Sequence, residues 1–314
     1  MTIGLILNAN CRESRLHPKR GAALATILSG RGTVRETRSM SDLEAAIADF
    51  RSQNIGHIAV VGGDGTIHTT VTQTIHEYRS HGLAVPVFSL LSGGTMNIVA
   101  HSVGVGACCP ERHLKSLLNA VDRGVARRET RNLLKVAGRY GFLFGAGVIE
   151  RFLAEFYRGS EQTPLTAAAT LVRALGGTIG IGTTLSRVAQ PFVGSITVDE
   201  NGVSKHWGAK SYLAVAGGTV EQLGFGFRPF WRCNEQPNTF HILGVTTTPA
   251  RLARYLGHIW LGRNLPESVA YQATASRVVL RSDKPIAYMF DGELYEGGTE
   301  LEVEVAEKIN FLCS

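Results

Sequence analysis

The sequence predicts two domains: an N-terminal α/β domain on a doubly wound parallel sheet, followed by a mainly antiparallel β domain. Residues 1–123 alternate apolar strands with amphipathic helices, whereas later residues form short strands with few helices. At 314 residues, the chain is also longer than one compact core usually serves. We therefore expect domains at 1–124 and 125–305, a linker at 124–128, and a tail, 306–314, that could return to the first domain.

The first domain is a regular series of strands and helices. The apolar pattern predicts strands at 3–7, 34–37, 58–61 and 85–91, and helices at 24–28, 43–50, 67–78, 98–103 and 114–121. Ser41 and Glu44 have the spacing of a capping box and are expected to begin the second of these helices. Such alternation is typical of a parallel sheet with helices on both faces.

The second domain is predicted from short strands. They are expected at 133–136, 142–145, 196–198, 212–216, 240–245, 277–280, 286–290 and 301–305, with helices at 165–175 and 252–261. Asn201–Gly202 is a strong hairpin signal because both residues adopt positive φ readily. The apolar, glycine-interrupted segment 167–185 has two interpretations: a core helix, or a flexible lip that admits an acyl chain or touches a bilayer.

A glycine turn between a strand and a helix makes residues 57–66, HIAVVGGDGT, the most informative stretch. Gly62, Gly63 and Gly65 let the backbone approach a ligand, and the N–H groups at the start of the helix favour an anion such as phosphate. Asp64 would repel phosphate, so we expect it to act through a bound cation or a hydroxyl. The alternative is a structural turn in which Asp64 caps the helix.

A second loop of the same kind follows the strand at 85–91. Residues 92–97, SGGTMN, also join an apolar strand to a helix. Because the carboxyl ends of parallel strands share one sheet edge, we expect both loops there, where ligands bind in open α/β folds. Thr66, Thr95 and Asn97 would offer neutral donors to phosphate.

Composition limits the classes of protein that remain. Apolar residues make up 44% and charged residues 18% of the chain, which indicates a folded globular protein. The net charge of +6 is scattered, which indicates solubility or a modest basic face for an anionic membrane or nucleotide, and not nucleic-acid binding. Five cysteines match no zinc spacing, and we expect reduced thiols in the cytoplasm. We expect no signal peptide and no membrane-spanning segment.

A resemblance to a known family rests on several motifs. They are GGDGT at 62–66, GTMN at 94–97, Asn8 after the first strand, the glycine-rich 145–150 and DGE at 291–293. Over nearly its whole length the chain is similar to the diacylglycerol kinase catalytic-domain family, which includes sphingosine and ceramide kinases and soluble bacterial lipid kinases. The resemblance implies a nucleotide-binding α/β domain, a C-terminal antiparallel β-sandwich domain and an active site in the cleft between them.

The resemblance also implies site residues and cofactors. The residues that it places around ATP are Asn8, Thr37, Gly62, Gly63, Asp64, Gly65, Thr66, Gly94, Thr95 and Asn97. Asp64 would support the phosphates and Mg²⁺, and Asp291 or Glu293 would take the proton of the lipid hydroxyl. The residues alone leave open that Asp291–Gly292 is only a β-turn and that Glu293 is only solvated.

Two departures from the family pattern bear on metal binding. Ile98 stands where members often have Asp, so any metal or water contact of that Asp is missing or made elsewhere. The acidic loop that holds a structural magnesium in bacterial relatives corresponds to residues 233–236, in which only Glu235 is acidic. Glu235 is therefore the one candidate ligand that this loop keeps.

The lead hypothesis is an ATP-dependent lipid kinase that phosphorylates a hydroxyl of a diacylglycerol-like or sphingoid lipid, with a role in phospholipid biosynthesis. We expect a cytoplasmic protein that contacts membranes peripherally and binds no nucleic acid, and a homodimer is left open. The alternatives are an NAD kinase-type phosphotransferase, which also carries GGDGT, and a non-catalytic nucleotide- or lipid-binding protein. The GTMN loop favours a lipid kinase over the first, and Asp64, Asp291 and Glu293 argue against the second.

Overall fold

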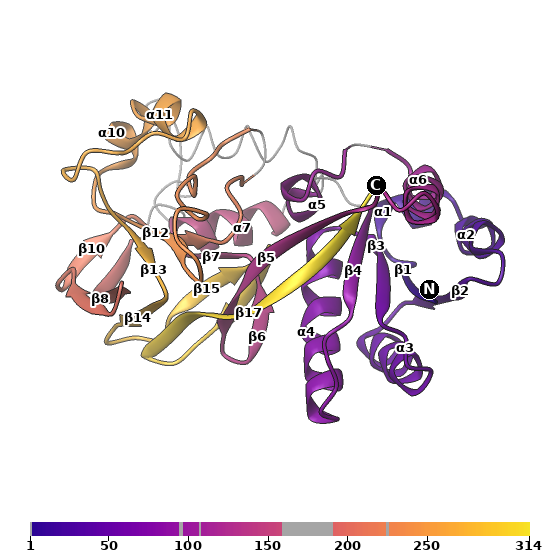
Figure 1. Cartoon of the computed structure of the whole chain (residues 1–314). Helices are drawn as coiled ribbons and strands as arrows, with labels where there is room; N and C mark the ends of the chain where they lie inside the picture. The colour runs from indigo at the N-terminus through magenta and orange to yellow at the C-terminus, as the bar shows by residue number, and fades with distance from the viewer. Residues whose placement is uncertain (1, 94–96, 107, 159–190, 224–225) are drawn as a thin grey trace. The chain divides into compact units, whose positions relative to one another are not determined.

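The chain divides into two compact units, shown in the computed structural model of Figure 1. The structure describes residues 2–93, 97–106, 108–158, 191–223 and 226–314. Unit 1 comprises Met1–Arg131 and Lys308–Ser314, and unit 2 comprises Asn132–Glu307. The helix expected at 165–175 and both interpretations of 167–185 lie outside the described residues.

Unit 1 is built on the predicted parallel sheet. Its strands are β1 (Ile3–Asn8), β2 (Gly32–Thr37), β3 (His57–Gly62) and β4 (Val87–Ser92), in the order β2-β1-β3-β4. The end of β17 (Glu300–Cys313) adds a further parallel strand beside β4, where Phe311 lies opposite Phe88. All six residues of β3 are buried because elements cover both faces of the sheet.

Helices cover the two faces in pairs. The pairs are α2 (Arg20–Leu28) with α6 (Pro110–Asp122), and α3 (Met40–Ser52) with α4 (Asp64–Ser80); the short α1 (Arg12–Leu16) and α5 (Ile98–Ser102) follow β1 and β4. Alternate residues of β1 serve alternate faces. Leu5 and Leu7 pack in the cluster that holds Leu24 of α2. Gly4 lies beneath Phe50 of α3, where a Cβ atom would come within 2.6 Å of the ring.

The start of α3 differs from the prediction. The capping box consists of Ser39 and Asp42, not Ser41 and Glu44. Ser39 has extended backbone and accepts a hydrogen bond at Oγ from the Asp42 amide (3.1 Å), and Asp42 Oδ2 accepts one from the Ser39 amide (3.1 Å). The helix therefore begins at Met40, and Ser41 already lies in its first turn.

Unit 2 is the predicted antiparallel β-sandwich. Its strands are the second part of β5 (Arg127–Val136), β6 (Arg139–Gly141), β7 (Leu143–Gly147), β8 (Phe192–Glu200), β9 (Val203–His206), β10 (Lys210–Tyr212), β11 (Ala214–Gly218), β12 (Phe240–Val245), β13 (Ala270–Ala275), β14 (Arg277–Arg281), β15 (Ala287–Phe290), β16 (Glu293–Glu296) and the first part of β17. One sheet has the order β13-β12-β11-β7-β15-β16, and the other contains β10-β8-β14-β17. Ile196 and Leu280 of the second sheet pack with Phe144, Ile242 and Tyr288 of the first in one core.

Two hairpins of unit 2 have the same two-residue turn. Asn201 and Gly202 connect β8 to β9, with φ of 53° and 79°. Asp291 and Gly292 connect β15 to β16, with φ of 48° and 88°. Positive φ at both central residues is the type I′ geometry that suits the twist of a hairpin. The hairpin expected at Asn201 is confirmed, and the DG of the DGE motif is also a hairpin turn.

Several elements of unit 2 differ from the predictions. Arg127 and Arg128 belong to strand β5 and not to a linker. The single helix expected at 252–261 is two short ones, α10 (Pro249–Ala253) and α11 (Leu256–Trp260), because the amides of Arg254 and Tyr255 bond three residues back in a tighter turn. The prediction missed α7 (Val148–Arg158) and the strands β6, β13 and β16.

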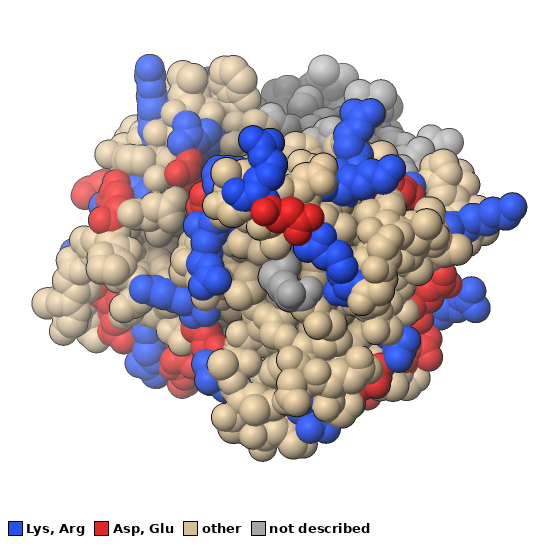
Figure 2. Space-filling model, turned by 45° about the vertical axis from the view of Figure 1, so that its right-hand side comes forward, with Lys and Arg blue, Asp and Glu red and all other residues tan. Residues whose placement is uncertain are grey.

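The surface and the thiols bear on the remaining sequence predictions. On the face shown in Figure 2, Lys and Arg side chains are dispersed, with Asp and Glu among them, as the scattered charge predicts. All five cysteines are free thiols. Among the described residues, no helix is long and apolar enough to cross a membrane.

Candidate active site

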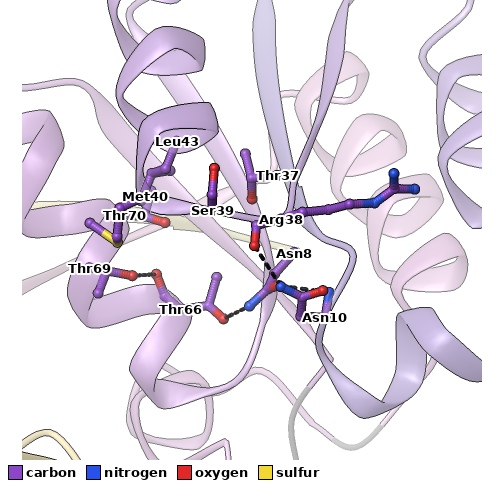
Figure 3. Close-up of a pocket in the computed structure, with 10 residues that line it drawn as sticks. All are labelled: Asn8, Asn10, Thr37, Arg38, Ser39, Met40, Leu43, Thr66, Thr69 and Thr70. Carbon is purple, nitrogen blue, oxygen red and sulfur yellow. Dashed lines mark hydrogen bonds between the residues drawn. The ribbon is translucent and has the colours of Figure 1, made fainter.

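The carboxyl ends of β1 and β2 and the start of α4 surround a pocket of about 330 Å³ in unit 1 (Figure 3). Its lining residues are Asn8, Asn10, Thr37, Arg38, Ser39, Met40, Leu43, Thr66, Thr69 and Thr70. Three of them, Asn8, Thr37 and Thr66, are among the predicted nucleotide residues. The pocket lies at the sheet edge where ligands bind in open α/β folds.

A hydrogen bond between two predicted residues forms the floor of this pocket. Asn8 Nδ2 donates to Thr66 Oγ1 (2.8 Å), which joins the end of β1 to the first turn of α4. Gly62 makes this arrangement possible, because a Cβ atom there would lie 2.4 Å from Thr66 Cβ. Gly63 precedes α4 with extended backbone, so the N–H groups of the first helical turn follow directly. The site thus combines amide and hydroxyl donors with a helix N-terminus, a combination that suits phosphate.

The opposite wall of the pocket comes from the loop after β2. Asn10 Nδ2 donates to the Arg38 carbonyl (2.7 Å), so the ends of β1 and β2 are held together. The amide of Arg38 and the hydroxyl of Ser39 lower the pKa of the Asp42 carboxyl, because their hydrogen bonds favour its charged form. Met40 and Leu43 give the same wall an apolar part. A pocket that offers both polar and apolar contacts suits a nucleotide better than a free phosphate ion.

Asp64 joins the first glycine loop to the second. Its Oδ2 accepts a hydrogen bond from the Ile98 amide (3.1 Å), and its Oδ1 accepts one from the Val99 amide (3.1 Å). These amides are the first two of α5, and the preceding residue, Asn97, has left-handed backbone with φ 50°. Asp64 therefore caps α5, and not the helix in which it lies. A side chain is not needed at position 98 for this contact, since the backbone makes it.

The second loop is tied to the first by the backbone as well. The Gly93 amide donates to the Gly62 carbonyl (3.2 Å), and a Cβ atom on Gly93 would come within 2.9 Å of the Gly62 nitrogen. Only glycine allows this approach. Gly94 and Thr95, which the sequence places around ATP, lie outside the described residues.

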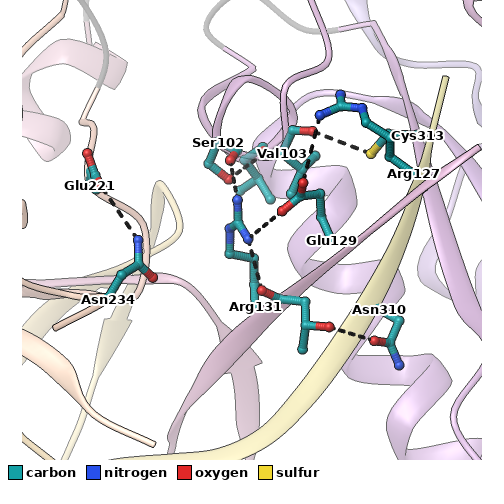
Figure 4. Close-up of polar contacts among 11 residues, drawn as sticks. Ser102, Val103, Arg127, Glu129, Arg131, Glu221, Asn234, Asn310 and Cys313 are labelled. Atoms are coloured by element: carbon teal, nitrogen blue, oxygen red, sulfur yellow. Dashed lines mark hydrogen bonds and ion pairs between the residues drawn. The ribbon is translucent and has the colours of Figure 1, made fainter. Parts of the chain in front are cut away.

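The far end of α5 is also fixed within unit 1 (Figure 4). Arg131 of β5 donates from Nη2 to the Ser102 carbonyl (2.6 Å), and its Nη1 is paired with Glu129 (3.2 Å). The Cys313 thiol donates to the Val103 carbonyl (3.4 Å). The helix that follows the second loop is therefore held by Asp64 at its start and by β5 and β17 at its end.

Asp291 lies in a different setting, inside unit 2. It is 4% exposed, and its carboxylate accepts hydrogen bonds from the amides of Phe142 (2.9 Å) and Leu143 (2.7 Å). Its own amide donates to the Leu143 carbonyl (2.9 Å). Glu293, two residues later at the start of β16, is exposed. The two acids of the motif thus divide into a buried carboxylate held by backbone and an exposed one.

Glu235, the acidic residue of the predicted structural-magnesium loop, is hydrogen-bonded to an arginine side chain. Glu235 Oε2 accepts a hydrogen bond from Arg232 Nε (2.9 Å), and the neighbouring Asn234 contacts Glu221 (3.4 Å, Figure 4). Among the described residues, no group of three His, Cys, Asp or Glu side chains could hold a metal ion. A magnesium ion that arrives with a nucleotide needs fewer protein ligands, because phosphate and water supply most of its oxygens. Asp64 remains the candidate for such a contact, and Glu235 remains a prediction.

A second pocket, of about 460 Å³, lies in unit 2 where α7 begins. It is lined by Gly147, Glu150, Arg151, Pro191, Phe192, Val193 and residues 282–287. Burial raises the pKa of the Glu150 carboxyl at its edge. The pocket is at the Gly147 end of β7, whereas Asp291 is bound at the Leu143 end, so the DGE motif is not part of it.

Sequence reasoning missed most of one pocket wall. Asn10, Arg38 and Ser39 follow the carboxyl ends of β1 and β2. Because ligands bind beyond such strand ends in open α/β folds, this position could have predicted them as pocket residues. Thr69 and Thr70 lie one turn after Thr66 on α4, where helical spacing could have placed them. Met40 and Leu43 depend on how α3 packs, which no local pattern shows.

Residues 4–126 match the family model described as the diacylglycerol kinase catalytic domain. This part of the chain, which lies within unit 1, is therefore similar to a diacylglycerol kinase catalytic domain, as its two glycine motifs predict. The match covers the sheet edge, both loops and every residue of the pocket in Figure 3.

Similarity to individual proteins extends over more of the chain. Two proteins named "Probable lipid kinase YegS-like", from two strains of Xanthomonas oryzae pv. oryzae, are 26% identical over 267 residues, which is 83% of this chain and 79% of theirs. A solved structure of a diacylglycerol kinase from Bacillus anthracis str. Sterne has a TM-score of 0.65 at 15% identity and covers 100% of this chain and 97% of its own. Two further structures from that organism reach 0.70 at 16% and 17% identity. At such identities the structures show a shared fold across both units.

Proposed function

We propose that this protein is an ATP-dependent lipid kinase that transfers the γ-phosphoryl group to a hydroxyl of a diacylglycerol-like or sphingoid lipid. The observation that carries the proposal is the pair of glycine loops joined by Asp64 beside a nucleotide-sized pocket. The catalytic-domain match and the names of the Xanthomonas relatives support the lipid as acceptor. A lipid acceptor also means that the protein would work at membrane surfaces.

The pocket residues fit a nucleoside triphosphate. Asn8, Thr37 and Thr66 would hold the ligand by neutral hydrogen bonds, and Met40 with Leu43 would contact an apolar part such as the base. The N-terminus of α4 at Gly63–Asp64 would face the phosphates. Mg²⁺, when bound with ATP, would neutralise charge on the transferring phosphoryl group, and Asp64 is the residue placed to support it.

Phosphoryl transfer depends on positioning and on a group that accepts one proton. The lipid hydroxyl oxygen forms a bond to the γ-phosphorus, the bond from that phosphorus to the β-bridging oxygen breaks, and ADP leaves. The hydroxyl proton passes to a carboxylate. We assign that role to Glu293, because its side chain is exposed, and assign to Asp291 the positioning of the hairpin that presents it.

The test is direct phosphorylation. Purified protein is incubated with labelled ATP, Mg²⁺ and mixed micelles of diacylglycerol, sphingosine, ceramide or monoacylglycerol, with NAD as a soluble acceptor. We expect one labelled lipid, lost in Glu293→Gln. Labelled NADP in place of lipid would contradict the proposal and identify the sister class of kinases.

A non-catalytic binding protein is the second candidate. It is favoured by one observation: the carboxylates of both Asp64 and Asp291 are held by backbone amides. Measurable ATP binding without any labelled lipid from the panel would support it. Equal product from wild type and Glu293→Gln would leave the kinase in place and remove Glu293 as the base.

A further inference from the structure

The α10–α11 segment of unit 2, labelled in Figure 1, carries exposed apolar and exposed basic side chains. Trp260 is 53% exposed and Leu261 is 48% exposed, although both are large apolar residues. Arg251, Arg254 and Arg263 are exposed on the same segment. These five residues are called the Trp260 surface below.

The apolar exposure is not a failure of packing. The other side of the segment is packed. Its residues Tyr255, Leu256 and Ile259 contact the hydrophobic cluster that contains Leu252 and Val269. Trp260 and Leu261 follow Ile259 directly and turn outward. Exposed apolar groups on an otherwise packed element mark contact sites.

Backbone contacts fix the shape of this surface. The Ile259 carbonyl accepts hydrogen bonds from the amides of Arg228 (3.0 Å) and Gly262 (3.2 Å), and the His258 carbonyl accepts one from Arg263 (2.8 Å). The indole nitrogen of Trp260 lies beside Gly226, where a Cβ atom would come within 2.8 Å of it. The surface is therefore preformed, which lowers the entropy cost of binding.

The charged side chains of the segment itself are of one sign. From residue 246 to residue 265 the sequence contains three arginines and no Asp or Glu. Arg254 and Arg263 form no ion pair with any residue that the structure describes, and Arg251 contacts only a hydroxyl, that of Ser268 (2.9 Å). By contrast, four other arginines of unit 2, Arg228, Arg232, Arg277 and Arg281, are paired with acids. The positive charge here is free to meet an anionic partner.

We propose that the Trp260 surface docks the protein on an anionic lipid bilayer. Trp260 and Leu261 enter the boundary between headgroups and acyl chains, and the three arginines meet lipid phosphates. Two large side chains on a narrow turn are too little area for a specific protein interface, which buries roughly 800 Å² per partner. The inference rests on the proposed function, because a lipid acceptor brings the enzyme to bilayers.

The test is vesicle flotation of the full chain without ATP, with phosphatidylcholine alone or mixed with phosphatidylglycerol. We expect wild type to float with the mixed vesicles, and each arginine to contribute roughly fivefold in affinity. Arg263→Glu should weaken binding at least that much, and Trp260→Ala with Leu261→Ala should weaken it more than tenfold. Val203→Ala, at a residue 59% exposed on β9, and Arg128→Glu, at an exposed arginine of unit 1, are the matched controls.

Fluorescence gives a second readout. The three tryptophans are Trp207, Trp231 and Trp260, and of these Trp260 is the exposed one. Mixed vesicles should shift wild-type emission to the blue, and Trp260→Phe should lose the shift while keeping most of the binding. Absent vesicle binding, or equal losses in the control variants, would overturn the docking proposal. Vesicle binding is measured without ATP and is therefore independent of the phosphorylation test. Vesicle binding without any labelled lipid in that test would contradict only the proposed function. Labelled lipid without vesicle binding would contradict only the docking surface.

Discussion

Asp64 in unit 1 and Asp291 in unit 2 make the same contact in different surroundings. Each carboxylate accepts hydrogen bonds from two consecutive backbone amides that are distant in sequence, 34 residues away for Asp64 and 149 for Asp291. Asp64 is partly exposed and stands at the start of a 17-residue helix whose first turns line the proposed nucleotide pocket. Asp291 is 4% exposed in a hairpin turn.

The difference separates positioning from chemistry. A carboxylate has about four lone-pair sites, so Asp64 can hold α5 and still face a ligand from its exposed side. Asp291 has no such open side, and its contribution is to hold the β15–β16 turn against β7. A motif acid can therefore be required for activity without touching the reacting atoms.

The largest effect is expected for Asp291→Ala. The substitution leaves the amides of Phe142 and Leu143 buried without their acceptor, and alanine tolerates the positive φ poorly. We expect unit 2 to lose about 3 kcal/mol of unfolding free energy. All three tryptophans lie between residues 207 and 260, so their fluorescence in a urea titration reports unit 2.

Glu293→Gln is the control for that variant. The side chain is exposed, so its unfolding free energy should stay within roughly 0.5 kcal/mol of wild type while lipid phosphorylation is lost. Asp291→Asn should lie between the two, because an amide oxygen can still accept one hydrogen bond and asparagine tolerates the turn. If the Asp291→Ala variant is stable but inactive, the positioning role is contradicted, and Asp291 becomes the candidate that accepts the proton of the lipid hydroxyl.

Asp64→Asn should act mainly on catalysis. Asparagine keeps one acceptor for α5 and loses the other together with the charge, so we expect kcat/KM to fall about hundredfold with only a small change in stability. If Asp64 acts only by joining the loops, the Mg²⁺ concentration that gives half-maximal activity should not change. A strongly raised Mg²⁺ requirement would make Asp64 a metal contact.

The matched control for Asp64 is Asp42→Asn. Asp42 also caps a helix and accepts two backbone hydrogen bonds, from Arg38 (2.8 Å) and Ser39 (3.1 Å). It ties its own helix to the loop before it and does not join the two glycine loops. Equal losses of activity in the two variants would show that the effect is one of capping in general.

Local chemistry made part of this predictable. The strand–turn–helix units follow from apolar periodicity, and the turns at Asn201 and Asp291 follow from residues that tolerate positive φ. The helix α7 was not predicted although its apolar residues have helical spacing, because the glycines just before it, Gly145 and Gly147, are typical of a loop. β13, with the sequence AYQATA, has small residues that give little strand signal.

The partners of the two aspartates were beyond prediction from sequence. A carboxylate in a glycine loop is equally consistent with a metal contact, a helix cap or a free side chain. The choice depends on where backbone amides from another part of the chain arrive, such as those of Ile98 or Phe142. That is a property of tertiary packing, and no spacing rule contains it.

Two buried histidines extend the comparison of the units to acid stability. Burial lowers the pKa of His57 in unit 1 to about 4 and that of His241 in unit 2 to about 3. The unfolded chain takes up these protons below pH 6.5 while the folded units stay neutral, so stability falls as pH drops from 6.5 toward the folded values. At pH 5 each histidine should account for roughly 2 kcal/mol of the loss.

His241→Phe tests this in unit 2. The ring contacts Phe230 and Trp231, with centroids 6.3 Å from each, so phenylalanine should fit. Tryptophan-monitored unfolding of the variant should show a flatter loss between pH 7 and pH 5, with little change at pH 7. If the variant loses as much unfolding free energy between pH 7 and pH 5 as wild type does, other groups govern the acid stability of unit 2.

The smallest effect is expected for two buried threonines of one helix, of which only one lines a pocket. Thr70 and Thr74 of α4 are both fully buried, and neither hydroxyl has a hydrogen-bond partner among the described residues. Thr70 lines the pocket of Figure 3, whereas Thr74 does not. A buried hydroxyl without a partner is unfavourable, so we expect valine to raise the stability of unit 1 at either position by similar amounts.

Nucleotide affinity should distinguish the two threonines. If the Thr70 hydroxyl bonds to bound nucleotide, Thr70→Val should weaken ATP binding about fivefold, the size of one neutral hydrogen bond, and Thr74→Val should leave it unchanged. Isothermal titration with ATP and with GTP checks this, and a loss confined to one nucleotide would assign Thr70 to base recognition. Equal affinities for both variants would show that the Thr70 hydroxyl does not contact the nucleotide, and that it is buried for packing alone, as we infer for that of Thr74.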